Sequence, residues 1–443
     1  PGSEAAAAAR GRGAVVLVGD ASDGHVLRRA GLRRARFLVS VCGEDATNAG
    51  VVVAARGLVV GRKGTLRAFV HVVDADLCGL LRAREIAGHQ EGGLRVEFFN
   101  VYDRGAGILL QRFPPFPVSD GVGHRSPHLV VVGLGRLGSS LVVQAARMWR
   151  DLPDRAGRLR ISVVDRDAGP RLEALAVGYP QLGQLCELRP LAIETKSAAF
   201  GRADFLLDSE GRRDAGTVFI CLDDPAQGLN AGLALLPRIG GGGVPVVVRV
   251  VQSAGLAGLI QEDAPRPAYR DLHAFPLLDE TCTPDLLLGG TYETLGRAIH
   301  EDYVAHQRSQ GQTTDTNPTM VAWEQLPEHV KESNRDQAAD MGAKLAAVGC
   351  GLTPLTDWEA PLLVFTPEEV ERLARMEHER WVAHLLSSGW SLAPGPKDPE
   401  RRTHPDLIPY DQLGEEKREL DRNAARGIPA FLARAGFHAY RLD

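Results

Sequence analysis

Three glycines near the middle of the chain have the spacing that seats a diphosphate. Gly133, Gly135 and Gly138 follow an apolar run, Leu129 to Val132, which is typical of a buried parallel strand, and they lead into a helical segment. The first glycine permits a tight turn, the second lets backbone N–H groups approach a pyrophosphate, and the third lets the helix pack closely on its strand. The N-terminus of that helix would direct its partial positive charge at the phosphates.

A carboxylate ends the next apolar strand and could bind a ribose. Asp165 closes the strand RISVVDRD 27 residues after Gly138, beyond the usual spacing of roughly 20, and the polar loop RDLPDRAGR accounts for the difference. An acid at this point would accept both ribose hydroxyls, which favours NAD(H), ATP or AMP over NADP(H), although the adjacent Arg166 would suit a 2′-phosphate. The alternative is a Rossmann-like domain with an empty site.

Composition excludes several classes of protein. The 443 residues are 44% hydrophobic with a formal net charge of −5, which allows about two to four ordinary domains and gives no reason to expect binding to nucleic acid. No apolar run approaches the roughly 18 residues that a membrane span needs, and no secretory signal is present. The six cysteines lie far apart without metal-like spacing, so we expect buried thiols of a cytosolic protein and no metal site.

No catalytic motif accompanies the glycine loop. The sequence has no G-x-S-x-G, no Walker loop and no nucleophile paired with a base, and none of its thirteen histidines has a supporting motif for proton transfer to a hydride acceptor. The segment HEDYVAH superficially resembles H-E-x-x-H, but its second histidine falls at i+6, which is the wrong spacing for zinc. We therefore expect no enzyme, and an NAD-dependent oxidoreductase is only a third hypothesis.

Strands and helices alternate through the first two thirds of the chain. This pattern predicts parallel, doubly wound α/β sheets. Ahead of the glycine loop, the expected strands and helices fall at Ala14 to Asp20, 25–32, 35–48, 49–60, 66–74, 75–86 and 95–101.

The chain contains two copies of this α/β unit. TVFICLDDPAQGLNAGLAL matches RFLVSVCGEDATNAGVVVA and places Asn230 against Asn48, and two later segments match in the same way. The first copy begins at what corresponds to a third strand, so either its opening half lies in a preceding sequence or the unit is incomplete. The expected domains are a tag remnant or flexible lead-in at 1–13, a partial unit at 14–120, a complete unit at 128–290 and a helical domain at 291–443.

Both copies resemble RCK domains, the regulators of potassium conductance, also called the TrkA N-terminal type. In the first copy the matching features are Gly19-Asp20, a helix containing Leu27 and Gly31, and Asp45 with Asn48; in the second, the glycine loop GLGRLG is similar. The resemblance implies a domain beneath a potassium channel or transporter that binds adenine nucleotides, dinucleotides or ions and pairs with a second copy. The implied ligand contacts are Gly133, Gly135, Arg136, Gly138 and Asp165. The third strand of the second copy, ELRPLAIETKS, departs from the family because it lacks a Gly-Asp pair.

The C-terminal third contains a different repeat. HEDYVAH (300–306) returns as HERWVAH (378–384), and NPTMVAWEQLPEHVKESNR (317–335) returns as HPDLIPYDQLGEEKRELDR (404–422). The second copy resembles a ryanodine receptor (RyR) repeat, a family in which such repeats occur in tandem pairs. Two interpretations of its aromatic residues stay open: a small hydrophobic core with internal hydrogen bonds, or a pocket that stacks a base and meets its phosphate. The candidate residues are His378, Trp381, Trp390, Tyr410, Lys417 and Arg422.

These features predict a cytosolic ligand-sensing module of a potassium channel or transporter at the inner face of the membrane. It would bind a nucleotide at the second α/β unit and a second ligand or partner at the RyR repeats, and it would act as a dimer or higher homo-oligomer. Its membrane partner would be a separate subunit or a pore segment upstream. The alternative hypotheses are a stand-alone soluble sensor of a nucleotide second messenger and a scaffold whose α/β lobes are structural relics.

Overall fold

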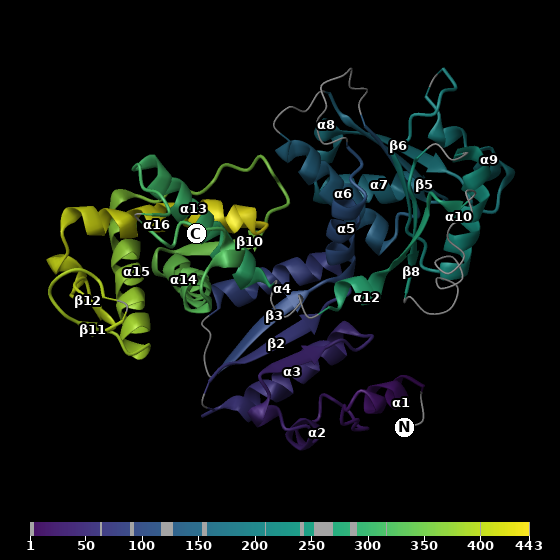
Figure 1. The fold of residues 1–443 in the computed structure, drawn as a ribbon. Coiled ribbons are helices and arrows are strands. Elements are labelled where there is room, and N and C mark those ends of the chain that lie inside the picture. Colours follow the sequence, from purple (N-terminus) through teal and green to yellow (C-terminus); the bar gives the residue numbers. More distant parts are fainter. Residues whose placement is uncertain are drawn as a thin grey trace. The chain divides into compact units, whose positions relative to one another are not determined.

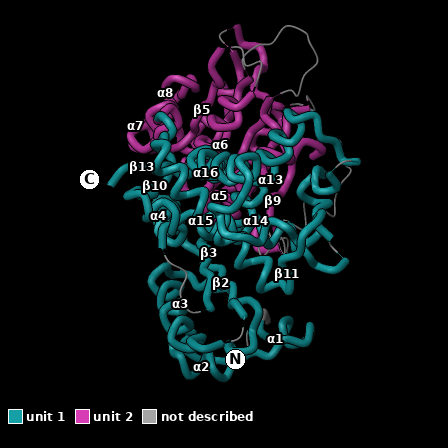
Figure 2. The backbone as a smooth tube through the Cα atoms, turned by 90° about the vertical axis from the view of Figure 1, so that its left-hand side faces the viewer, with its two compact units in different colours: residues 1–99, 287–355, 361–443 teal, residues 100–286, 356–360 magenta. Residues whose placement is uncertain are grey.

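The computed structural model describes residues 4–62, 64–88, 93–116, 127–152, 157–208, 210–239, 243–251, 269–283, 290–315, 317–398 and 400–442. The chain forms two compact units, which Figure 2 distinguishes by colour. Unit 1 comprises residues 1–99, 287–355 and 361–443, and unit 2 comprises residues 100–286 and 356–360. The predicted boundary at residue 120 and parts of the aligned segments after residues 251 and 283 lie outside the described residues.

Unit 2 is built on a six-stranded parallel sheet in the order β6-β5-β4-β7-β8-β9. Because the chain order reverses between β4 and β7, the carboxyl ends of these two strands form a topological switch point, where doubly wound folds bind ligands. Every residue of β4 and β7 is buried, which explains why only apolar residues follow His128 and Thr217, the first residues of the two strands. The strands are β4 (His128–Val132), β5 (Leu159–Asp165), β6 (Cys186–Ala192), β7 (Thr217–Ile220), β8 (Val246–Val250) and β9 (Leu272–Pro276).

Helices cover both faces of this sheet (Figure 1). They are α5 (Val101–Arg112), α6 (Arg136–Asp151), α7 (Ala168–Gly178), α8 (Leu182–Leu185), α9 (Ala198–Arg202), α10 (Pro225–Ile239) and α12 (Leu277–Thr281). Helix α5 had been expected in the first α/β unit, but it packs on α6 within unit 2. Ser140 donates a hydrogen bond to the Asp103 carboxylate at 2.7 Å, and Gln144 donates to the Asp103 carbonyl at 2.6 Å.

Unit 1 contains a three-stranded parallel sheet in the order β1-β2-β3. Asn48 is fully buried in the first turn of α3, where its side chain bonds Ser40 of β1 and the carbonyl of His71 in β2 and so ties the two strands together. The elements are α1 (Glu4–Gly11), α2 (Gly24–Arg29), β1 (Phe37–Ser40), α3 (Asp45–Val59), β2 (Leu66–His71), α4 (Ala75–Ala87) and β3 (Leu94–Phe99). The predicted fold class of parallel α/β sheets is confirmed.

Three details of the sequence-based expectations are corrected. Residues 14 to 20 do not form a strand, and Val15 is 88% exposed. The corresponding strand of unit 2 is β6, which pairs with β5, whereas among the described residues of unit 1 no strand lies beside residues 14 to 20. The expected lead-in contains helix α1, whose alanines favour helix formation. Asn48 is the fourth residue of α3 and therefore corresponds to Gly228, the fourth of α10, and not to Asn230.

The C-terminal part of unit 1 contains two repeats of helix, turn, helix and strand. The first comprises α13 (Thr291–Ser309), α14 (Glu328–Ala347) and β10 (Cys350–Pro354), and the second α15 (Pro367–Ser387), α16 (Glu415–Arg434) and β13 (Phe437–Arg441). Strands β10 and β13 pair antiparallel, which joins the repeats. The second repeat adds a short ladder of β11 (Ser391–Leu392) and β12 (Thr403–His404).

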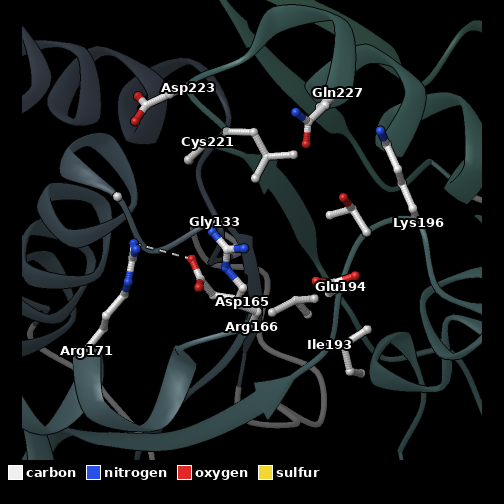
Figure 3. Close-up of a pocket in the computed structure, with 14 residues that line it drawn as sticks. Gly133, Asp165, Arg166, Arg171, Ile193, Glu194, Lys196, Cys221, Asp223 and Gln227 are labelled. Carbon is white, nitrogen blue, oxygen red and sulfur yellow. Dashed lines mark ion pairs between the residues drawn. The ribbon is translucent and has the colours of Figure 1, made fainter.

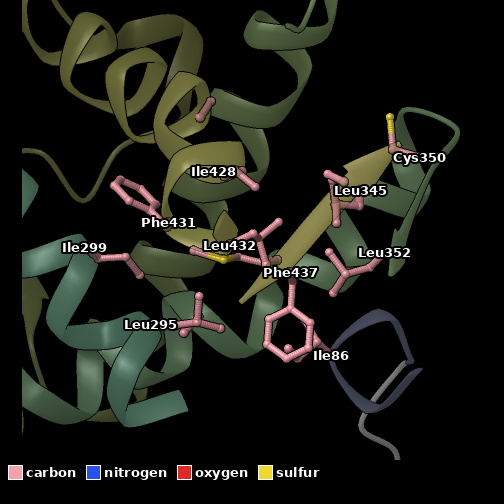
Figure 4. Packing of buried hydrophobic residues seen from close by; sticks show 14 of the residues in the cluster. Ile86, Leu295, Ile299, Leu345, Cys350, Leu352, Ile428, Phe431, Leu432 and Phe437 are labelled. Carbon is pink, nitrogen blue, oxygen red and sulfur yellow. The ribbon is translucent and has the colours of Figure 1, made fainter. Parts of the chain in front are cut away.

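The two repeats share one hydrophobic core (Figure 4). Leu295 and Leu345 from the first repeat meet Ile428 and Phe437 from the second, together with Ile86 of α4. Equivalent polar contacts recur in both repeats. His300 contacts the Val321 carbonyl at 2.8 Å and His378 contacts the Ile408 carbonyl at 2.7 Å. The internal repeat in the sequence therefore corresponds to a repeat in three dimensions.

A buried ion cluster also crosses between the repeats. Lys344 of α14 lies 2.6 Å from Glu377 of α15, and Arg380 donates to the other Glu377 oxygen at 2.6 Å. Burial alone would raise the pKa of Glu377, but the two cations outweigh it and lower that pKa to about 2. Removing one partner from such a cluster leaves an uncompensated buried charge.

The stability of unit 1 is expected to depend on this carboxylate. Because the folded pKa of Glu377 lies below its ordinary value of 4.5, the stabilisation is complete above about pH 5 and is lost as the pH falls toward 2. We expect urea unfolding to show a loss of about 3 kcal/mol over this interval. Glu377→Gln should flatten the dependence, and an unchanged dependence in that variant would contradict the assignment.

Candidate functional site

A cavity of about 450 Å³ opens at the carboxyl ends of the strands of unit 2 (Figure 3). Of the residues predicted from the glycine motif and the second strand, Gly133, Gly135, Asp165 and Arg166 line it. Arg136 and Gly138 do not line it, since Arg136 lies over the Tyr102 ring and Gly138 packs under the loop. The structure thus brings most of the predicted nucleotide contacts to one hollow.

The glycine loop is held by backbone hydrogen bonds to the neighbouring strand. Gly133 has a φ of +90°, a conformation that favours glycine, and its N–H donates to the Val164 carbonyl at 2.8 Å. The N–H of Leu134 donates to Asp165 Oδ2 at 2.8 Å, and the carbonyl of Leu134 accepts from Arg171 at 3.1 Å. Asp165 is therefore a support of the loop as well as a candidate ribose acceptor.

The start of α6 leaves backbone donors available for an anion. Gly135 is the N-cap residue and provides no side-chain cap. Among the described residues, neither the N–H of Gly135 nor that of Arg136 has a hydrogen-bond partner. Unpaired N–H groups at the N-terminus of a helix of this length, together with its dipole, suit a phosphate group.

Several cavity residues were not found from the sequence. Arg171, in the first turn of α7, lies 3.5 Å from Asp165 Oδ2, and the segment after β6 supplies Glu194 and Lys196. Lys196 extends toward the cavity from the side opposite Gly133 (Figure 3). The only feature of the sequence that pointed to Glu194 and Lys196 was the absence of the family's Gly-Asp pair from this third strand. The replacement of a Gly-Asp pair by ETKS places both a carboxylate and an amine at this rim.

Two further groups bear on the chemistry of the cavity. Asp223 lies at the rim near Gly135, and Arg249 pairs with it at 2.8 Å, which neutralises a carboxylate that would otherwise repel phosphates. Cys221 also lines the cavity, and burial raises the pKa of its thiol far above the ordinary value. A thiol that stays protonated at neutral pH is a poor nucleophile.

Two protein families match parts of the sequence. The TrkA-N domain model matches residues 2–84, and the RyR domain model matches residues 366–441. The chain carries a TrkA-N domain and a RyR domain. Both matches confirm the families inferred from the residues.

The other comparisons are distant. No curated protein matches this sequence. GsuK bound to ADP is 16% identical over 61% of this chain with a TM-score of 0.38, and the GsuK channel is 14% identical over 62% with the same score. The chain spans 57% of each of those chains. A D-lactate dehydrogenase from Treponema pallidum is 11% identical, with 62% and 86% of the two chains covered and a TM-score of 0.21. Scores this low do not establish a common fold.

The residues predicted for a RyR ligand pocket separate into two groups. His378 and Tyr410 are buried, and burial alone would lower the pKa of His378, but the Asp421 carboxylate at 3.4 Å and the Ile408 carbonyl raise it above its ordinary value. Arg422 bonds three carboxylates and Lys417 pairs with Asp406 at 3.4 Å; the partners of Arg422 are Glu371, Glu415 and Glu419. Arg335 repeats the arrangement with Glu293, Glu328 and Glu332 in the first repeat. Arg422 is therefore part of the repeat's framework and is not a free phosphate ligand.

The two tryptophans of the second repeat form the other group. Trp381 and Trp390 are both partly exposed and flank His404, whose ring centroid lies 4.9 Å from that of Trp381 and 6.4 Å from that of Trp390. Lys397 lies 5.5 Å from the centre of the Trp390 ring. His404 of β12 and Lys397 of the segment between β11 and β12 were not among the predicted residues, and the described residues of the first repeat contain no such ladder that the internal repeat could have indicated.

Among the helices that the structure describes, none is both long enough and apolar enough to cross a membrane. The described residues also contain no group of three or more histidine, cysteine, aspartate or glutamate side chains positioned to hold a metal ion.

Gly138 is expected to be essential for the shape of the loop. A Cβ at this position would lie 2.1 Å from the Gly133 carbonyl oxygen, whereas a Cβ at Gly135 would meet nothing closer than 3.8 Å. We expect Gly138→Ala to lower the free energy of unfolding of unit 2 by about 3 kcal/mol. Gly135→Ala should leave it within about 1 kcal/mol, since it lacks such a contact. Equal calorimetric melting of the two variants would contradict this geometry.

Proposed function

We propose that this chain is a regulatory module that senses a nucleotide at the cavity of unit 2 and controls a potassium channel or transporter. The observation that carries the proposal is the unpartnered N–H group of Gly135, which lines the same open cavity as the Asp165 carboxylate, followed along the chain by the unpartnered N–H group of Arg136. The TrkA-N match supports the regulatory role.

The ligand would have a free ribose and one or more phosphate groups. Asp165 would accept the ribose hydroxyls, Gly135 and Arg136 would donate to the phosphates, and Arg166 would lie at the ribose edge. We favour NAD(H), ATP or AMP over NADP(H), because a 2′-phosphate would lie against the carboxylate. The partners in this proposal are a membrane channel or transporter subunit and further copies of this chain, and the module works in the cytoplasm at the inner face of the membrane.

A carboxylate placed at the phosphate site should abolish binding. Gly135→Asp adds a negative charge where the diphosphate is expected, and the position has room for the side chain. We expect calorimetric titration with ADP and NADH to show a Kd raised about 100-fold or more, because like charges in contact cost several kcal/mol. Gly135→Ala is the matched control and should bind nearly as the unaltered chain does. Unchanged affinity in the Gly135→Asp variant would rule out this site.

A second candidate function is the sensing of a nucleotide second messenger by the RyR domain. The partly exposed pair Trp381 and Trp390, with Lys397 beside it, favours a planar anionic ligand. The His404 ring lies within 4.9 Å of the Trp381 ring and 6.4 Å of the Trp390 ring, and a base stacked on either partly exposed indole would replace solvent there. This candidate needs no membrane partner.

The RyR candidate can be tested with the first site blocked. In a Gly135→Asp background, we expect a panel of mononucleotides and cyclic dinucleotides to contain a compound that still raises the Tm. Trp390→Ala should weaken its binding about tenfold, since stacking on a base contributes about 1–3 kcal/mol. Leu392→Ala, an exposed neighbour in the same ladder, should have no effect. Equal Tm shifts in the two variants would exclude the tryptophan site.

A further inference from the structure

Helix α6 leads from the nucleotide cavity to a buried tryptophan. The helix begins beside the glycine loop at Arg136, and near its other end the guanidinium carbons of Arg147 and Arg150 lie 5.2 and 5.7 Å from the ring centre of Trp358. Cation–π contacts of this kind contribute about 0.5–2 kcal/mol each. The C-terminal end of α6 is therefore fastened to this indole.

Helix α7 leads from the same cavity to the same tryptophan. Arg171 in its first turn contacts Asp165 in the cavity. Tyr179, the residue that caps its C-terminal end, packs on Trp358 with ring centroids 5.8 Å apart. Gln181 follows, and its Oε1 accepts a hydrogen bond from the backbone N–H of Trp358 at 3.1 Å. Both helices that begin at the proposed nucleotide site thus end at Trp358.

Trp358 belongs to the linker between the two RyR repeats. Residues 356–360 are part of unit 2, whereas the chain on either side of them belongs to unit 1. The side chain is 9% exposed, and its indole N–H has no hydrogen-bond partner among the described residues. A buried unpaired N–H costs about 1–3 kcal/mol, so the docked linker is less stable than its packing alone would make it.

We propose that Arg147, Arg150, Tyr179 and Gln181 form a socket for Trp358 that holds the linker more tightly when a nucleotide occupies the cavity. This inference rests on the function proposed above. A ligand that contacts both the glycine loop and Asp165 fixes the start of α6 relative to the start of α7, and Trp358 joins the ends of the same two helices. The nucleotide restricts the motion of α6 relative to α7 at one end, and Trp358 restricts the same motion at the other end. Once one of them is bound, the other loses less conformational entropy on binding, so the two binding events are cooperative.

If nucleotide binding stabilises the docked Trp358, then the docked Trp358 must strengthen nucleotide binding by the same factor, and both changes can be measured on the full chain. Trp358→Ala should raise the Kd for ADP or NADH in calorimetric titration by about fivefold or more, the lower end of ordinary coupling between sites. Glu359→Ala, an exposed neighbour in the linker, should leave the Kd unchanged. In the unaltered chain, saturating nucleotide should slow amide hydrogen exchange in the peptide 356–365 by about fivefold or more.

The outcomes separate this inference from the proposed function. Nucleotide binding with the same Kd in Trp358→Ala, and with no change of exchange in the linker, overturns the socket but leaves the nucleotide site standing. An unaltered chain that binds neither nucleotide overturns both. If circular dichroism shows that Trp358→Ala does not fold, Trp358→Leu carries the same expectation for the Kd. The exchange measurement on the unaltered chain decides the matter without any variant.

Discussion

The proposed site depends on how the backbone of Leu134 is held. Its N–H donates to Asp165 at the end of β5 and its carbonyl accepts from Arg171 at the start of α7, so one residue of the glycine loop is fixed from two directions. With Leu134 engaged, the following N–H groups at Gly135 and Arg136 face no competing protein acceptor among the described residues. Preorganised donors of this kind need no rearrangement when an anion binds, which is why the cavity suits a diphosphate.

The structure could be predicted from the sequence where a residue's type and its immediate neighbours determine its conformation or burial. Gly133 takes a positive φ, Gly138 lies against the loop, and the apolar runs 129–132 and 218–220 lie in strands whose residues are all buried. Local pattern alone was insufficient where a distant partner decides the outcome. The apolar residues from 14 to 20 look like a strand, but a strand forms only beside a neighbour, and among the described residues no strand pairs with this segment. Lys196 and Arg171 belong to no sequence motif. They line the cavity because the sheet topology brings the segment after β6 and the first turn of α7 next to the glycine loop.

In the RyR repeats, some predicted ligand residues hold the helices together, whereas others are partly exposed. Arg335 and Arg422 occupy equivalent places and bind three carboxylates each, so a charge that the sequence offered as a phosphate ligand serves to hold helices together. Among the described residues, the second repeat alone has the β11 and β12 ladder, and Trp381 of α15 and Trp390, which precedes β11, are partly exposed there. Because the shared residues maintain the common fold, the residues that differ between the repeats are the ones to test for ligand binding.

The central claim is that the amides at the start of α6 bind the diphosphate of a nucleotide, and a crystal structure of the chain grown with ADP or NADH tests it most directly. The account predicts phosphate oxygens within about 2.7 to 3.2 Å of the backbone nitrogens of Gly135 and Arg136, with the ribose hydroxyls on Asp165. A nucleotide bound elsewhere while this cavity holds only solvent would contradict the account.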